Sequence, residues 1–108
     1  MKNITTRDLN ESLTLLLPQR HDDGEGGWRE EWESGLHLWA SLWPLIGAHA
    51  EDTPHYRIII RAGVTLPSKI AFLWHLHQQP KRLSVLSSPV LIQYNRFLSM
   101  TAKEEINA

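Results

Sequence analysis

The chain has 108 residues, a formal net charge of −1 and no cysteine. Residues 1–108 are therefore expected to form one domain, because typical domains hold roughly 100–150 residues. Hydrophobic residues make up 42% of the chain and charged residues 21%, a balance that excludes a disordered protein. The lack of cysteine excludes a disulfide framework, a thiol nucleophile and thiolate metal sites. No apolar run approaches the roughly 20 residues of a membrane span, and the first residues lack the apolar block of a secretory signal.

The near-neutral charge is the sum of two opposed halves. Residues 1–54 hold four basic and ten acidic residues, a net charge of −6. Residues 55–108 hold seven basic and two acidic residues, a net charge of +5. The two halves therefore either pair within one fold or face different partners.

In chain order, turn residues divide the sequence into short apolar pieces, which is typical of an all-β fold. Residues 1–11 are expected to form a flexible arm, Pro18 to end the first strand, and segments 22–27 and 28–34 to form loops. Period-two alternation predicts the strands, at 13–17, 36–43, 56–61, 70–76, 83–85 and 97–100. The best site for a helix is 44–52, and it is short. The expected architecture is a small β-barrel of about six to seven antiparallel strands, with long loops and at most one short helix.

Four of the five tryptophans fall within residues 28–43. In the strand expected over 36–43, Trp39 and Trp43 share a parity opposite to that of Leu38 and Leu42. Two readings of this aromatic face stay open. Either the rings complete the core, or another subunit covers part of them.

No pattern in the chain supports catalysis or a bound ion. His75 and His77 would point to one side of a strand, but they lack a third metal ligand in register, so a half-buried strand face is the simpler interpretation. The acidic loop at Asp22 does not have the ligand spacing of a calcium loop. The nucleophile-elbow, phosphate-loop and dinucleotide fingerprints are absent from the sequence. We therefore expect no enzyme, no catalytic residues, no cofactor and no metal.

Basic residues of the second half lie among aromatic ones, as they do in barrels that bind single-stranded nucleic acid by stacking and phosphate contact. The residues concerned are Arg57, Arg61, Lys69, Lys81, Arg82 and Arg96, with Tyr56, Phe72, Trp74, Tyr94 and Phe97. A sequence pI near 6.6 argues against a dedicated nucleic-acid binder. Binding of single-stranded nucleic acid stays an alternative function.

The order of several short motifs resembles that of the head–tail joining proteins of tailed bacteriophages, also called head closure or stopper proteins. The resemblance covers roughly residues 12–105. It rests on Glu30-Glu31-Trp32, Leu38-Trp39-Ala40-Ser41-Leu42-Trp43-Pro44-Leu45, Tyr56-Arg57-Ile58-Ile59-Ile60-Arg61, the stretch 70–76 and Pro80-Lys81-Arg82-Leu83. Gene transfer agents use proteins of the same type.

The resemblance implies a β-barrel that assembles into a ring, commonly a hexamer, in the neck of a virion or phage-like particle. The ring would lie between a portal or adaptor ring and the tail terminator or tail tube. Packaged double-stranded DNA would pass through its channel, and no membrane is involved. During assembly the protein would be in the host cytoplasm. Another connector component, such as a tail terminator, is an alternative.

Heterologous contacts between identical subunits suit an acidic half and a basic half. The residues expected at an interface between subunits or rings are Asp22, Asp23, Glu25, Trp28, Glu30, Trp32, Arg57, Arg61 and Arg96. The loop expected to line the channel consists of Gly63, Val64, Thr65, Leu66, Pro67 and Ser68.

Overall fold

Seven antiparallel strands make up one sheet in the computed structural model, which describes residues 3–45, 53–76 and 79–105. A single 3-10 turn, η1 (Thr6–Asp8), precedes them. The strands are β1 (Glu11–Asp22), β2 (Trp28–Leu45), β3 (His55–Arg61), β4 (Ala71–Trp74), β5 (Lys81–Val85), β6 (Val90–Ile92) and β7 (Phe97–Glu104). The all-β prediction is confirmed. Of the expected helix, the first two residues belong to β2, and residues 46–52 lie outside the described chain.

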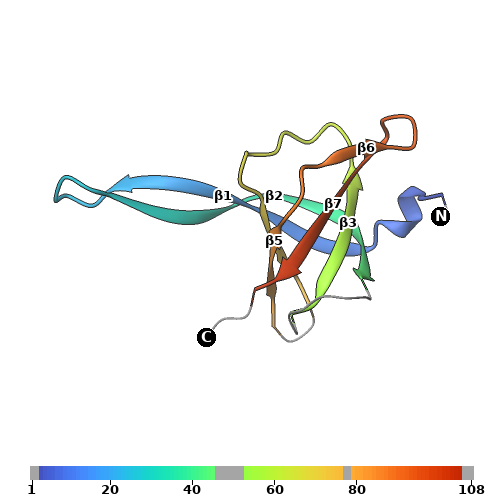
Figure 1. The fold of residues 1–108 in the computed structure, drawn as a ribbon, viewed down its shortest axis with the longest axis horizontal. Helices are drawn as coiled ribbons and strands as arrows, with labels where there is room; N and C mark the ends of the chain where they lie inside the picture. The colour runs from blue at the N-terminus through green and yellow to red at the C-terminus, as the bar shows by residue number, and fades with distance from the viewer. Residues whose placement is uncertain (1–2, 46–52, 77–78, 106–108) are drawn as a thin grey trace.

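Six of the strands pair in the order β3-β2-β1-β4-β5-β7, and β7 pairs back with β3. We call this closed set the strand ring (Figure 1). One edge of β7 carries β3, and the other carries β5 near residue 103 and β6 near residue 98. Closure satisfies both edges of the central strands and removes the open edges at which sheets aggregate.

The core fills the inside of the strand ring with inward-facing residues from every one of its strands. Phe72, Ile58, Ile60 and Leu83 are fully buried. The other members of this cluster are Leu13, Leu15, Leu38, Ala40, Ile70, Met100 and Ala102. Burial of each large side chain contributes about 1.5–3 kcal/mol. Because the members come from all six ring strands, the core holds the ring closed.

A second, smaller cluster lies on the outer face of β3 and β7. Ile4 and Leu9, from the segment expected to be a flexible arm, are buried there against Ile59 and Phe97. The side-chain amide of Gln93 donates to the Ile4 carbonyl at 2.7 Å and accepts from the Ile4 amide at 2.5 Å. These two hydrogen bonds fasten the described part of the amino-terminal segment to the turn between β6 and β7.

The long first hairpin extends beyond the strand ring. β4 pairs with β1 only at residues 13–16, and β3 pairs with β2 only at residues 40–45. Residues 17–34 are therefore a two-stranded ribbon, which we call the hairpin arm (Figure 1). It makes the molecule 53 Å long and raises the radius of gyration to 15.2 Å, against about 13 Å for a compact domain of this length.

The hairpin arm corrects two sequence predictions, since residues 28–34 form part of β2 rather than a loop, and β1 continues through Pro18. Beyond residue 16, one edge of β1 has no neighbour in the described chain, and proline is tolerated in strands that have such a free edge. Polar residues occur on both faces of the arm strands, so these strands lack the regular apolar–polar alternation that signals a strand.

A β-bulge marks the base of the arm, where Leu15 lies opposite both Gly35 and Leu36. A Cβ at Gly35 would lie 2.9 Å from Leu17 Cδ1 and 3.1 Å from the Leu15 carbonyl oxygen. Only glycine fits such a close approach without movement of its neighbours. The bulge bends and twists the ribbon as it leaves the strand ring.

Candidate interaction surfaces

The tip of the hairpin arm is a well-defined acidic turn. Asp22 accepts a hydrogen bond from the Gly24 amide at 2.9 Å. Asp23 accepts from the Glu25 amide at 2.8 Å and from the Gly27 amide at 3.0 Å. Those two backbone hydrogen bonds, Glu25 first, lower the pKa of the Asp23 carboxyl. The turn therefore presents fixed negative charge at the far end of the molecule.

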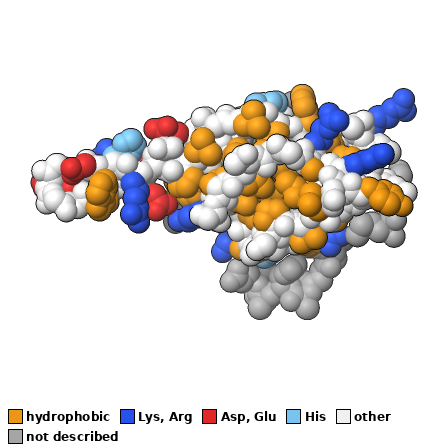
Figure 2. Space-filling view, turned by 90° about the horizontal axis from the view of Figure 1, so that it is seen from above, with side chains coloured by type: hydrophobic (Ala, Val, Ile, Leu, Met, Phe, Trp, Pro, Cys, Tyr) orange, Lys and Arg blue, Asp and Glu red, His pale blue; other side chains and the backbone are white. Residues whose placement is uncertain are grey.

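Trp28 begins β2 next to this turn, and its Cα partner across the arm is Asp22. Trp28 is 69% exposed. A large exposed indole of this kind is typical of a surface that binds a partner. Figure 2 shows the arm bearing charged side chains of both signs, while hydrophobic side chains gather on the body.

The base of the arm contacts the body of the same chain. Trp32 packs against Lys69, whose Nζ is 5.4 Å from the ring centroid, and against Arg82, whose guanidinium carbon is 4.6 Å from it. Lys69 also forms an ion pair with Glu30 at 3.0 Å. Glu30 and Trp32, two of the expected interface residues, thus have partners within the chain.

The three expected interface arginines have separate positions. Arg61 and Arg96 line one hollow of about 740 Å³, together with Ile4, Thr5, Thr6, Ala62, Gly63, Asn95 and Phe97. We call it the arginine hollow. Arg57 is half-buried within β3 and does not line it. In the described chain, none of the three arginines forms an ion pair with an acidic side chain.

The acidic turn and the amino-terminal segment lie at opposite ends of the longest axis (Figure 1). Residues 4–6 of that segment line the arginine hollow, so the hollow lies far from the acidic turn. Among the described residues, the ion pair between the two halves of the chain joins Lys69 to Glu30 at the base of the arm. No described basic residue of the second half forms an ion pair with the acidic turn at the arm tip. The two halves of opposite charge therefore do not neutralise each other at the arm tip.

The loop expected to line a channel runs from Gly63 to Ser68. Gly63 has a φ of +94°, which glycine adopts readily. Val64 and Leu66 pack against the core, whereas Thr65 and Ser68 are exposed. The loop is thus held at two positions and presents its polar residues to solvent.

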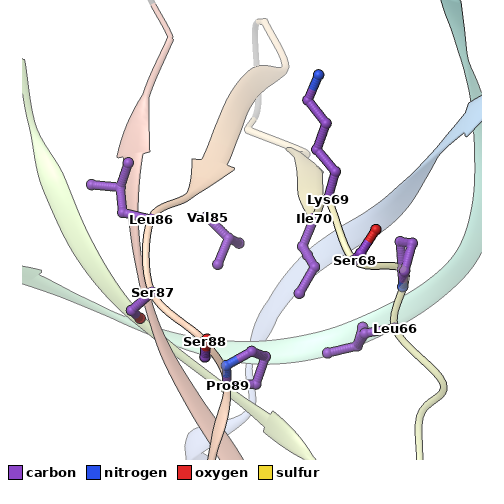
Figure 3. A pocket seen from close by; sticks show the side chains of 10 residues that line it. Leu66, Ser68, Lys69, Ile70, Val85, Leu86, Ser87, Ser88 and Pro89 are labelled. Carbon is purple, nitrogen blue, oxygen red and sulfur yellow. The ribbon is translucent and has the colours of Figure 1, made fainter.

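A groove of about 550 Å³ separates the end of this loop from the connection between β5 and β6 (Figure 3). Leu66 and Ile70 lie on one side of it, and Val85, Leu86 and Pro89 on the other. Its lining is a mixture of apolar side chains and the serine hydroxyls of positions 68, 87 and 88.

Several large apolar side chains are exposed on the strand ring. Trp39 and Trp43 are 55% and 44% exposed on β2, so the rings do not complete the core. A second group surrounds β6 and comprises Leu86, Val90, Leu91 and Tyr94, with Tyr94 96% exposed. Of this second group only Tyr94 was singled out from the sequence, because β6 has only three residues and its apolar run resembles that of a buried strand.

Two histidines stack on the outer surface, with the His37 and His75 ring centroids 6.2 Å apart. Each ring contacts a hydroxyl of β1, His37 that of Ser12 at 2.5 Å and His75 that of Thr14 at 2.7 Å. His77 lies outside the described residues. Within the described ranges, no three His, Asp or Glu side chains are grouped to hold a metal ion. No described helix has the length and apolar character to cross a membrane.

The fold belongs to a class of small all-β proteins with a closed set of strands and a projecting hairpin. No protein-family model and no curated protein matches the sequence. Among solved structures, protein SF1141 of Shigella flexneri 2a aligns with a TM-score of 0.72 and 21% identity, over 89% of this chain and 92% of that one. A chain from the virion of a native gene transfer agent particle aligns with a TM-score of 0.68 and 24% identity, over 93% of this chain and 97% of that one. At these identities the likeness shows the fold.

Proposed function

We propose that this chain is a structural head–tail connector of a tailed bacteriophage or phage-like particle, of the stopper or head-completion type. It would form a ring of subunits, commonly a hexamer, below the portal or its adaptor. The ring would extend the DNA channel, retain packaged double-stranded DNA and dock the tail. The observation that carries the proposal is the fold match to a gene transfer agent virion chain over nearly the full length of both chains.

The shape and charge of the chain support this role. A ring of identical subunits uses heterologous contacts, in which one surface meets a different surface of the next copy. Here a projecting acidic arm lies at one end of the molecule, opposite the amino-terminal segment (Figure 1). That segment helps to line the arginine hollow, whose two arginines form no ion pair with a described acidic residue. Exposed Trp28, Trp39 and Trp43 provide apolar surface for neighbours. The role is structural and needs no catalytic group.

Binding of single-stranded nucleic acid, the alternative, has less support. Stacking on bases requires exposed aromatic rings beside free cations. Phe72 and Phe97 are buried in the two cores, and Tyr56 and Trp74 pack against each other with ring centroids 5.3 Å apart. Lys81 forms an ion pair with Glu104, and Arg82 forms one with Glu105. Of the aromatic residues in that pattern, Tyr94 is left fully open.

Deletion of the gene in the host that produces the particles tests the proposal. We expect heads that lack tails and lose their DNA, with recovery of complete particles when the wild-type chain is supplied. Tailless heads that remain full would instead indicate a tail-side component such as a tail terminator. Tailed, DNA-filled particles from the deletion strain would overturn the connector role. Titration with oligonucleotides at physiological salt tests the nucleic-acid alternative separately.

For the channel, we propose that the exposed residues Gly63, Thr65 and Ser68 line it, since Val64 and Leu66 are anchored in the core. The chain has no cysteine, so a Thr65→Cys variant can be labelled at that position alone. A bulky maleimide at position 65 should slow DNA release from assembled particles. Labelled Ser34→Cys, at an exposed position on the hairpin arm, is the control, and equal release from both would exclude this loop from the channel.

A further inference from the structure

On one face of the arm part of β2, tryptophan and glutamate residues occupy successive positions. Trp28, Glu30 and Trp32 alternate along the strand, so their side chains share a face. The inner part of that face docks on the chain's own body, where Trp32 lies against Lys69 and Arg82 while Glu30 pairs with Lys69. An indole with a neighbouring carboxylate, set against two cations, is therefore a contact that this arm already makes once.

At the outer end of the same face, an indole again lies beside carboxylates, but here no described cation contacts the indole. Trp28 extends past the body and is 69% exposed, and in the described chain no cation lies over its ring. The acidic turn places Asp22, Asp23 and Glu25 beside it. The arm tip thus has an indole and three carboxylates that match a basic surface.

The arginine hollow is such a surface. Arg61 and Arg96 line it and have no acidic partner among the described residues, while buried Ile4 and Phe97 supply apolar lining. Its volume of about 740 Å³ exceeds the roughly 150 Å³ that suffices for a benzene ring, so an indole fits. The guanidinium groups can pack on the indole face and pair with carboxylates at the same time.

The arm tip cannot reach the hollow of its own chain. The arm projects about 20 Å from the body, at about 3.3 Å per residue over residues 17–22. The amino-terminal segment that lines the hollow lies at the other end of the 53 Å axis (Figure 1). On the face drawn in Figure 2 the acidic side chains lie on the arm, while basic side chains also lie at the far end of the body. The arm tip therefore needs a basic surface on another molecule, and a second copy of this chain carries one.

We propose that the arm tip of one copy docks in the arginine hollow of the next, with Trp28 packed on the guanidinium groups and the acidic turn paired with Arg61 and Arg96. This contact is heterologous, so repetition around an axis closes a ring. The inference deepens the proposed connector function and rests on the ring that this function requires.

Site-directed crosslinking in assembled particles tests the contact. Position 25 lies in the acidic turn and position 6 lines the hollow, so we combine Glu25→Cys with Thr6→Cys in one otherwise cysteine-free chain. A short bis-maleimide should yield a ladder of covalent oligomers that ends at the ring size. Each single variant should give no ladder, because the contact joins unlike surfaces. Glu25→Cys with Ser68→Cys, whose second position is also exposed, is the matched control.

A ladder from the 6/25 pair above that control supports the inference. No such ladder in particles that have tails and retain DNA would overturn this contact and leave the connector function standing. Crosslinks from position 25 to a portal, adaptor or tail protein alone would also overturn it. The deletion strain tests the connector function separately. Normal particles from that strain would refute the function, whatever the crosslinking result.

Charge reversal gives a second, independent measurement. Association of purified chains, followed by sedimentation, should weaken at least about tenfold for Trp28→Ala. Arg96→Glu and Glu25→Arg should each weaken it, and the two changes together should restore it, since the opposite charges meet again. Raised salt should weaken the wild-type contact in the same direction. Equal association for all variants, or a double variant weaker than both single ones, would refute the pairing.

Discussion

The strand ring and the hairpin arm are built from the same two strands but are stabilised differently. Inside the ring, β1 and β2 have neighbours on both edges and bury Leu13 and Ala40 completely. Beyond the bulge, the same strands have only each other, and most arm side chains are exposed. An isolated two-stranded ribbon is marginally stable in water. The ring therefore stabilises the fold, whereas the arm depends on its base and is left free to contact something else.

The contacts at the base show what the arm depends on. Trp32 between Lys69 and Arg82, and the close approach at Gly35, join it to the ring. A change in the ring should unfold the whole chain, and a change at the base should loosen the arm alone. The predictions below test this division, from the largest expected effect to the smallest.

Phe72→Ala should cause the largest loss of stability. Phe72 has no exposed surface and lies in the centre of the ring core. Removal of a buried phenylalanine ring costs about 3–5 kcal/mol, which is much of the total stability of a small domain. Denaturant unfolding monitored by circular dichroism measures the change. Leu91→Ala, at a 50% exposed position, is the control and should change stability by less than about 0.5 kcal/mol.

Gly35→Ala should act on the junction between the two regions. The new Cβ would meet Leu17 side-chain carbons at 2.9 Å and the Leu15 carbonyl at 3.1 Å, and overpacking of this kind costs about 1–3 kcal/mol. Hydrogen exchange should rise in residues 17–34 more than in β3 or β7. Leu17→Ala in the same chain should recover part of the loss, because it opens the space. Uniform loss of protection in ring and arm would contradict the division.

Gln93→Ala should release the amino-terminal segment while the ring stays folded. It removes the two hydrogen bonds to the Ile4 backbone, and hydrogen bonds of this kind are worth about 0.5–1.5 kcal/mol each. Proteolysis near Ile4 and exchange at Ile59 report the release. Tyr94→Ala is the matched control, since residues 93 and 94 both have positive φ and Tyr94 is 96% exposed. Equal effects of the two variants would show that the turn, not the amide pair, matters.

The ring was largely predictable from sequence because local alternation and burial agree there. The strand expected over 56–61 is β3 within one residue, and Leu38 and Ala40 face the core as their parity indicates. The arm was not predictable, since beyond Leu17 at its base its residues pack on no hydrophobic core and show no alternation of apolar and polar residues. Pairing with the other half of the hairpin, rather than any preference of Glu31 or Glu33, makes them a strand.

The same contrast between local patterns and long-range pairing applies to the candidate interaction surfaces. That the acidic turn is exposed follows from its composition. That Arg61 and Arg96 share a hollow depends on the pairing of β3 with β7, where Arg61 lies opposite Phe97. These residues are far apart in sequence, so no local pattern could bring them together. The use of Glu30 and Trp32 within the chain also depends on a distant partner, Lys69.

The smallest effect that we predict is a loss of ring stability at high pH. A hydrogen bond to Glu104, with Lys81 Nζ 3.0 Å from Oε1, raises the pKa of Lys81 above its ordinary 10.5. Burial, followed by the charge of Glu104, raises the pKa of Tyr56 above its ordinary 10.0. The Lys81 contact is present below the unfolded pKa and is lost as pH rises through the folded value. Tyr56 ionises first in the unfolded chain, which also favours unfolding at high pH.

Both groups therefore predict a free energy of unfolding that falls once the pH exceeds about 10. Glu104→Gln removes the main cause of the Lys81 shift and part of the Tyr56 shift, so its stability should depend less steeply on pH in that range. Tyr56→Phe should remove the tyrosine contribution, which spectroscopic titration of the phenol measures directly. Glu33→Gln on the arm should leave the slope unchanged, because Lys81 and Glu104 join β5 and β7 within the ring. An identical slope for Glu104→Gln and Glu33→Gln would show that alkaline unfolding does not begin at this pair.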